Sequence, residues 1–218
     1  NLQGLRGDYE GMVDSFMALL HDRPNYLRTV QNSFNRNLRV STDVRQSDMV
    51  RRKVLKASQE HPEDTVFLEL LVWVFNQQRD FLSAMAHVRA LDERNGEGGQ
   101  RLMELAEVAA KNGDLETAHE CYALVAAKGA NSPRYAEARQ AMLQVKTEQI
   151  TGSFPLDTAA AVDLSNQYRL TLQDLGESPE TAPMMADWAH LLAFHLQDSE
   201  TAKSLLDRAV DMPGLALD

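Results

Sequence analysis

The chain has little of several features that define other classes of protein. Its 218 residues include one cysteine and one isoleucine (Ile150), and aromatic residues make up 6%. The single cysteine, Cys121, excludes an intramolecular disulfide framework and a zinc cluster built on cysteines. The scarcity of isoleucine argues against a sheet-rich fold. No apolar run approaches the ~20 residues that a membrane-spanning helix needs.

The chain also lacks the positive charge that is typical of nucleic-acid-binding proteins. Its formal net charge is −10, so we expect no nucleic acid among its partners. The charge is uneven, because residues 1–60 carry +3 and the remainder −13. Arg45, Arg52 and Lys56 share one face of a predicted helix and form a basic patch. This patch is either a solvated helix face or a contact for an anionic partner or lipid headgroup.

What the chain does have is helical periodicity along almost its whole length. Apolar residues recur at i, i+3, i+4 and i+7, and turn residues interrupt them at short intervals. Asp80, Asp114, Ser132 and Asp198 each precede a helical pattern as a predicted N-cap. We predict helices over 8–21, 25–38, 46–60, 63–78, 81–94, 99–112, 115–127, 133–150, 157–175, 181–196 and 199–211.

The strongest pattern is an internal repeat. Two segments carry the same spacing of apolar and small residues, and their equivalent positions lie 34 residues apart. The positions are Leu68, Leu71, Val72, Phe75 and Ala84 in the first segment, and Leu102, Leu105, Ala106, Ala109 and Ala118 in the second. The small residues mark places where two helices cross closely, since a larger side chain would overpack the contact.

This pattern resembles the tetratricopeptide repeat (TPR), in which each repeat is a pair of antiparallel helices. The stretch Asn112-Gly113-Asp114 and the Ala118 that follows it are its most typical part. The resemblance implies an all-α fold, namely a right-handed superhelical α-solenoid of TPR-like hairpins with about eleven helices. Stacking of the hairpins is expected because one hairpin cannot cover its own apolar face.

The whole chain, residues 1–218, is therefore predicted to form a single TPR-like solenoid. Its expected parts are an orphan second helix (7–21), a degenerate repeat (25–60), two repeats (63–94 and 99–127), an elongated repeat (133–175) and a last repeat (181–213). The orphan helix and the uncapped last repeat indicate a segment of a larger repeat protein. Residues 24–32 and 181–194 resemble a group of long bacterial TPR proteins. That resemblance implies the cell envelope or periplasm, with a cytoplasmic location as the alternative.

No set of residues in the sequence has the pattern of a catalytic or metal site. His190 and His195 are five residues apart, which places them on different helix faces. Glu116 and His119 have the spacing of a di-iron motif but lack the second pair that such a site needs. We therefore predict no catalytic residues, no metal, no cofactor and no enzymatic activity.

The TPR resemblance implies instead that the first helices of the hairpins line a concave surface where peptides bind. Trp73 is the natural anchor there, because binding energy concentrates in Trp, Tyr and Arg, although it could equally pack inside the stack. Met103, Asp187, Leu191 and Phe194 also occupy first-helix positions. The predicted ligand-binding residues are Arg28, Gln31, Asn35, Glu69, Trp73, Asn76, Gln77, Glu107, Lys111, Gln140 and Gln144.

Two functions follow from this pattern. The first is a non-enzymatic scaffold that binds a protein or peptide partner in the concave face. The second is a structural segment of a larger envelope protein, in which the repeat surfaces mediate intramolecular or homotypic packing and the chain forms a homo-oligomer.

Overall fold

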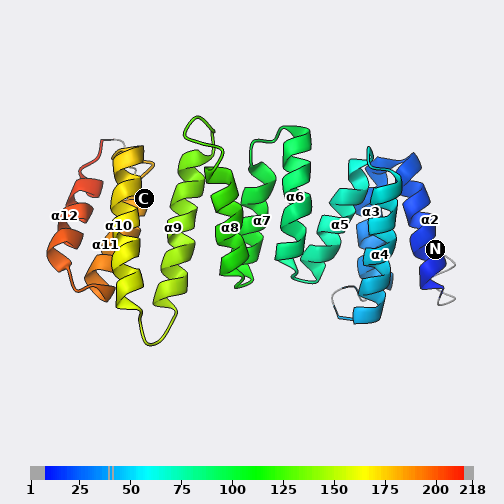
Figure 1. The fold of residues 1–218 in the computed structure, drawn as a ribbon, viewed down its shortest axis with the longest axis horizontal. Coiled ribbons are helices and arrows are strands. Elements are labelled where there is room, and N and C mark those ends of the chain that lie inside the picture. Colours follow the sequence, from blue (N-terminus) through cyan, green and yellow to red (C-terminus); the bar gives the residue numbers. More distant parts are fainter. Residues whose placement is uncertain (1–7, 39, 41, 214–218) are drawn as a thin grey trace. The chain divides into compact units, whose positions relative to one another are not determined.

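The structure, a computed structural model, describes residues 8–38, 40 and 42–213. Over these residues the chain is all-helical, with eleven α-helices and one short 3-10 helix (Figure 1). The helices are α2 (Tyr9–Asp22), η1 (Pro24–Tyr26), α3 (Leu27–Asn37), α4 (Val44–Glu60), α5 (Thr65–Gln77), α6 (Phe81–Asn95), α7 (Gln100–Lys111), α8 (Leu115–Ala126), α9 (Tyr135–Thr151), α10 (Thr158–Leu175), α11 (Ala182–His195) and α12 (Ser199–Val210).

The predicted helix boundaries agree with these bounds to within two residues. The carboxylates of Asp80, Asp114 and Asp198 accept a hydrogen bond from a first-turn amide of α6, α8 and α12, as predicted. The prediction for Ser132 was wrong. The helix α9 begins at Tyr135, and its N-cap position is held by Arg134 without a side-chain hydrogen bond.

The 34-residue repeat appears in the structure as the same turn between two helices. The amide of Asp80 donates to the carbonyl of Phe75 at 3.0 Å, and the amide of Asp114 donates to that of Ala109 at 3.0 Å. The residues before the two aspartates, Arg79 and Gly113, both have a positive φ (55° and 83°). These equivalent turns join α5 to α6 and α7 to α8.

The chain divides into two compact units, one ending at Leu105 and one beginning at Ala106. In the first unit, α5 packs against α4, α6, α3 and α2, and α2 also packs against α4. Its core contains fully buried large side chains such as Phe34, Phe67 and Leu70, and Ala84 is fully buried on α6.

In the second unit, α8 packs against α9, α9 against α10 and α11, and α11 against α10 and α12. The helices α9 and α10 are long, with 17 and 18 residues. The rings of Tyr168 and Trp188 stack with centroids 6.4 Å apart, and the Trp188 indole N–H donates to Ser165 Oγ at 2.8 Å. Both rings belong to the buried hydrophobic core of this unit.

None of the helices in the described part of the chain combines the length and the apolar composition needed to cross a bilayer.

Candidate functional site

Trp73 lies where α5 faces α3. The sequence left open whether this side chain is exposed to a ligand or packed inside the stack, and its environment has features of both. Its ring is half-buried and packs on Phe34 of α3, with the ring centroids 6.2 Å apart. Phe34 in turn makes an edge-on contact with Phe16 of α2 at 5.7 Å. Trp73 is thus held by a row of aromatic side chains while part of its ring stays accessible to solvent.

Other residues predicted for the same surface are polar and lie on α3 and α5. Arg28 and Asn35 are exposed, whereas Gln31, Asn76 and Gln77 are half-buried. Among the described residues, Asn76 Oδ1 is the buried side-chain oxygen or nitrogen that has no hydrogen-bond partner. Asn76 follows Trp73 by three residues on α5, so both side chains lie on one face of that helix. We call Gln31, Asn35, Trp73 and Asn76 the Trp73 surface.

Glu69, also predicted for this surface, is already engaged within the chain. Its carboxylate forms an ion pair with Arg101 at 3.3 Å, and Arg101 forms a second ion pair with Glu97 at 2.5 Å. The Glu97 hydrogen bond is the largest influence raising the pKa of Arg101, and the same bond lowers the pKa of Glu97. Glu69 therefore acts first as a structural partner of α7.

In the second unit the predicted ligand-binding residues have different surroundings. Glu107 and Lys111 are exposed and form an ion pair with each other at 3.6 Å. Gln140 donates to the carbonyl of Glu180 at 3.2 Å, and Gln144 is exposed.

The four other first-helix residues also differ among themselves. Met103 and Leu191 are buried, so the prediction that they line an open surface was wrong. Phe194 is 73% exposed. Asp187 is half-buried, and burial raises the pKa of its carboxyl.

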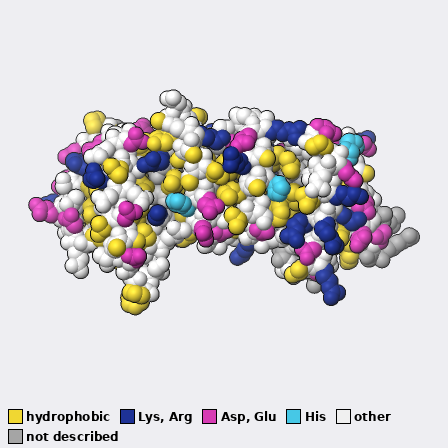
Figure 2. Space-filling view, viewed as in Figure 1, with side chains coloured by type: hydrophobic (Ala, Val, Ile, Leu, Met, Phe, Trp, Pro, Cys, Tyr) yellow, Lys and Arg dark blue, Asp and Glu magenta, His cyan; other side chains and the backbone are white. Residues whose placement is uncertain are grey.

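The predicted basic patch lies on α4. Arg45, Arg52 and Lys56 are all exposed, and Lys56 makes a loose ion pair with Glu60 at 3.6 Å. Figure 2 shows several Lys and Arg side chains close together over the region of α4. Two neighbouring cations are tied to carboxylates, Arg51 to Asp48 at 2.9 Å and Lys53 to Asp14 at 2.7 Å. Arg51 and Lys53 are therefore less available to an anionic partner, and the basic patch consists of Arg45, Arg52 and Lys56.

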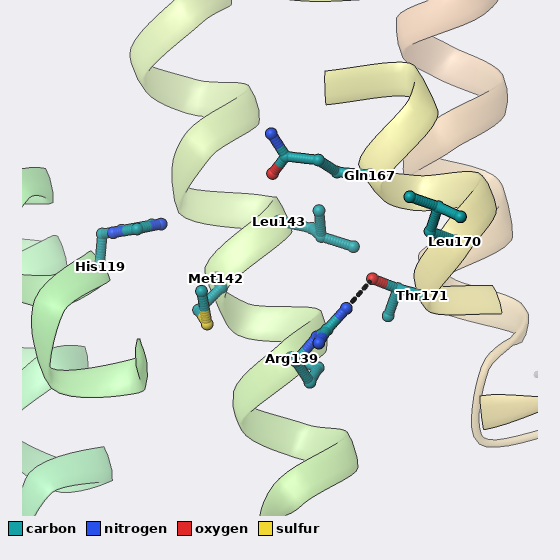
Figure 3. Close-up of a pocket in the computed structure, with 7 residues that line it drawn as sticks. All are labelled: His119, Arg139, Met142, Leu143, Gln167, Leu170 and Thr171. Atoms are coloured by element: carbon teal, nitrogen blue, oxygen red, sulfur yellow. Dashed lines mark hydrogen bonds between the residues drawn. The ribbon is translucent and has the colours of Figure 1, made fainter. Parts of the chain in front are cut away.

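A small cavity of about 110 Å³ lies in the second unit among α8, α9 and α10 (Figure 3). Within it, Arg139 donates to Thr171 Oγ1 at 2.8 Å, and His119 lies at the opposite side. Burial lowers the pKa of His119, which favours its neutral form. The sequence analysis did not find this cavity, because its residues come from three helices with no shared motif. The remaining lining residues are Met142, Leu143, Gln167 and Leu170.

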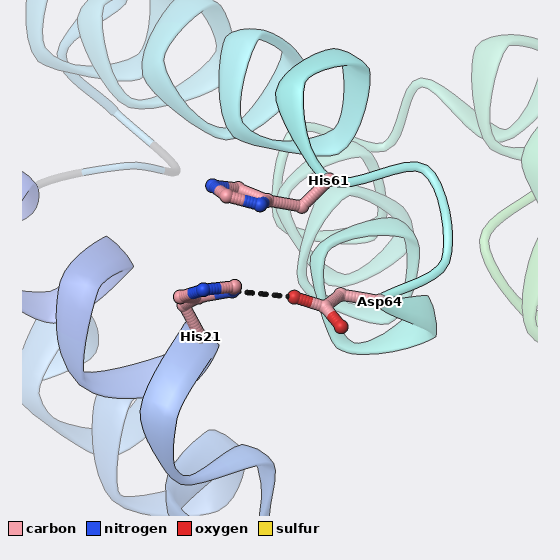
Figure 4. Close-up of side chains that lie close together, drawn as sticks. All are labelled: His21, His61 and Asp64. Carbon is pink, nitrogen blue, oxygen red and sulfur yellow. Dashed lines mark hydrogen bonds and ion pairs between the residues drawn. The ribbon is translucent and has the colours of Figure 1, made fainter.

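A second group that the sequence analysis did not find joins two histidines and an aspartate in the first unit (Figure 4). His21 Nδ1 lies 2.7 Å from Asp64 Oδ2, and the rings of His21 and His61 face each other with centroids 4.0 Å apart. The Asp64 hydrogen bond is the largest influence raising the pKa of His21. The two histidines lie 40 positions apart in the sequence, so no local spacing reveals the pair.

Comparison with known proteins adds the following findings. No protein-family model and no curated protein matches the chain. Among solved structures, it is similar to the nearly identical TPR-like repeats of a kinesin light chain-type protein from Podosopora anserina. The identity is 13% and the TM-score 0.45, over 86% of this chain and 93% of the other. It is also similar to BtubC (BKLC) from P. vanneervenii. Here the identity is 14% and the TM-score 0.43, over 91% of this chain and 89% of the other.

Proposed function

We propose that the protein is a non-enzymatic scaffold that binds an extended segment of a partner protein at the Trp73 surface. The observation that carries this proposal is the pairing of a half-buried tryptophan with a buried amide oxygen that lacks a hydrogen-bond partner, one helical turn apart. Burying an acceptor without a partner costs free energy, and a donor on a bound peptide would remove that cost.

The chemistry of the surface suits a peptide backbone more than a specific charged motif. Side-chain amides can both donate to and accept from backbone groups, and three of the four members of the Trp73 surface carry one. The indole ring offers a large rigid contact that is already held in place by Phe34, so little conformational freedom is lost on binding. A partner is therefore expected to present one apolar side chain beside an extended backbone.

Selection from a displayed library of random peptides tests the proposal without knowledge of the natural partner. Peptides enriched on the intact chain are expected to bind Trp73→Ala at least about 30-fold more weakly, as for a hot-spot tryptophan. Trp188→Phe is the matched control, because Trp188 is buried in the second unit, and it should bind as the intact chain does. Asn76→Leu, which removes the acceptor oxygen at similar volume, provides a second test in case Trp73→Ala alters the fold, which circular dichroism would reveal. Equal binding by both surface variants contradicts the proposal.

The alternative function, homotypic packing within a larger envelope protein, has its own supporting observation. Leu206 and Val210 lie four residues apart on α12 and are 43% and 55% exposed, so they form a small apolar strip. Light scattering over a range of concentrations separates the two functions. Association that is lost on Leu206→Glu favours homotypic packing, and a mass equal to the monomer at every concentration counts against it.

A further inference from the structure

We propose that His21, His61 and Asp64 form a binding site for a divalent transition metal ion, with zinc as the best match. Each residue offers one ligand atom, and these atoms all lie within 4.8 Å of one another. Among the described residues, this is the one such group of three or more histidine, cysteine or carboxylate side chains. Ligand atoms on a tetrahedral zinc ion lie about 3.3 Å apart, given bonds of about 2.0–2.1 Å.

The three side chains come from the ends of three helices. His21 lies in the last turn of α2, His61 is the C-cap residue of α4, and Asp64 is the N-cap residue of α5. Figure 4 shows the two imidazole rings one above the other, with the carboxylate beside His21. A metal ion at this point would join α2 to the turn between α4 and α5.

Asp64 differs from the other aspartates at helix starts. Aspartate holds the N-cap position of seven described helices. In six of them, α2, α4, α6, α8, α10 and α12, the carboxylate accepts from a first-turn amide. The Asp64 carboxylate makes no such bond to α5 and is directed to His21 instead. Asp64 therefore contacts an imidazole and does not make the N-cap hydrogen bond that normally stabilises a helix start.

The turn that carries His61 and Asp64 is held in place from outside. The Asp64 amide donates to the His61 carbonyl at 3.0 Å. Arg94 of α6 donates to the carbonyls of Pro62 and Glu63 at 2.6 Å and 2.7 Å. The His61 ring also lies 5.9 Å from that of Phe67. Two of the three ligands are thus positioned before an ion arrives, which favours binding because less freedom is lost.

Charge and accessibility also suit a cation. Asp22 and Glu63 add negative charge around His21. The guanidinium of Arg94 carries the opposite charge, and it is bound to the carbonyl oxygens of the turn. The His21 side chain is 46% exposed and that of Asp64 22% exposed, so an ion can enter from solvent and keep water at its open position. Two imidazoles with one carboxylate suit zinc, copper, nickel or cobalt, whereas magnesium and calcium prefer ligand sets made of oxygen.

Binding replaces a hydrogen bond with two metal–ligand bonds. In the metal-free protein, His21 Nδ1 and Asp64 Oδ2 share a hydrogen. A zinc ion takes the place of that hydrogen. The proton leaves to solvent when His21 is the imidazolium ion, or moves to Nε2 when it is neutral, and no oxidant or reductant is involved. Binding is therefore expected to weaken as the pH falls and His21 becomes protonated.

Calorimetric titration of the untagged chain with zinc chloride tests the site. We expect one zinc per chain, and binding at least about tenfold weaker in His21→Ala and in Asp64→Asn, which is the scale of effect seen when ligand-supporting groups are lost. His190→Ala is the matched control. His190 faces His195 with ring centroids 5.8 Å apart but belongs to no three-ligand group, so its loss should leave the affinity unchanged.

Two measurements on the intact chain keep the test decisive if a variant does not fold. The ring nitrogen resonances of His21 and His61 should shift on addition of zinc, while those of His190 and His195 stay in place. Cobalt should give the visible absorption of a bound ion, and excess magnesium should not remove it. The proposal is overturned if zinc does not bind, if it binds without shifts at His21 and His61, or if the variants retain full affinity.

Discussion

The carboxylate of Asp92 accepts the amide hydrogen of Gly99, with both of its oxygens 2.8 Å from the nitrogen. Asp92 lies near the end of α6 and is fully buried, and its Oδ1 also accepts from the amide of Arg101 at 3.3 Å. A side chain on one helix therefore caps the start of the next. The Asp92 carboxylate thus holds the glycine-rich turn between α6 and α7 by accepting hydrogen bonds from its backbone amides. In a phosphate-binding loop such amides would be available to a phosphate group instead.

We expect Asp92→Ala to destabilise the chain by about 2–4 kcal/mol, because it leaves buried amides without an acceptor. Urea denaturation measures this change. Asp198→Ala is the matched control, since it removes a more accessible N-cap and should cost about 1 kcal/mol. Equal losses for the two variants would show that the burial of Asp92 adds nothing.

The repeated turn predicts a stabilising substitution. Arg79 has a φ of 55° and Gln197 a φ of 58°. At the position equivalent to Arg79 in the next repeat, Gly113 has a φ of 83°. Arg79→Gly and Gln197→Gly should each stabilise the chain by about 0.5–1 kcal/mol, because relief of the left-handed strain outweighs the added freedom of the unfolded chain. Thermal unfolding measures the gain.

The converse substitution, Gly113→Ala, is the control for this prediction. No other atom lies within 4 Å of an added Cβ there, so any loss of stability comes from the backbone conformation alone. A lower Tm for both glycine variants, or no loss in Gly113→Ala, would contradict the interpretation.

Cys121 is expected to be unreactive in the folded chain. Burial raises the pKa of its thiol to about 12, so the reactive thiolate is almost absent at pH 8. Ellman's reagent should label the thiol only after guanidinium chloride has unfolded the chain. Rapid labelling of the native protein would mean that the second unit opens at this position.

Asp187 should make stability depend on pH in a defined direction. Burial raises the pKa of its carboxyl, and His190 acts in the opposite direction. The folded state therefore holds this proton to a higher pH than the unfolded state does, and the chain loses stability as the pH rises between the two pKa values. Asp187→Asn should be more stable than the intact chain at pH 7, and the difference should shrink as the pH falls and vanish well below 3.8, the ordinary pKa of an aspartate. The exposed Asp163→Asn, measured in parallel, should show a smaller difference.

The fold could be predicted from the sequence because its signals are local. Turn residues, aspartate caps and the 3.6-residue period each act within a few positions of the chain, and the 34-residue repeat adds a long-range check on them. Ser132 shows where this reasoning fails, since a good capping residue in a turn does not have to be the one at which the helix starts.

The sites were less predictable because they depend on contacts between distant segments. Helix position alone could not tell that Leu191 is buried while Phe194 is exposed, as both occupy first-helix positions. Nor could it tell that Glu69 is held by Arg101, 32 residues away. The His21–Asp64 contact spans 43 residues and leaves no local motif at all.

Binding of a peptide at the Trp73 surface can be followed by tryptophan fluorescence. The chain has two tryptophans, so Trp188→Phe leaves Trp73 as the sole indole reporter, and Trp73→Phe leaves Trp188. The most direct measurement is the fluorescence of each single-tryptophan chain during titration with a library-selected peptide. We expect a saturable blue shift and loss of acrylamide quenching for Trp73, with no change for Trp188. A peptide that binds without altering the Trp73 emission would contradict the proposed function.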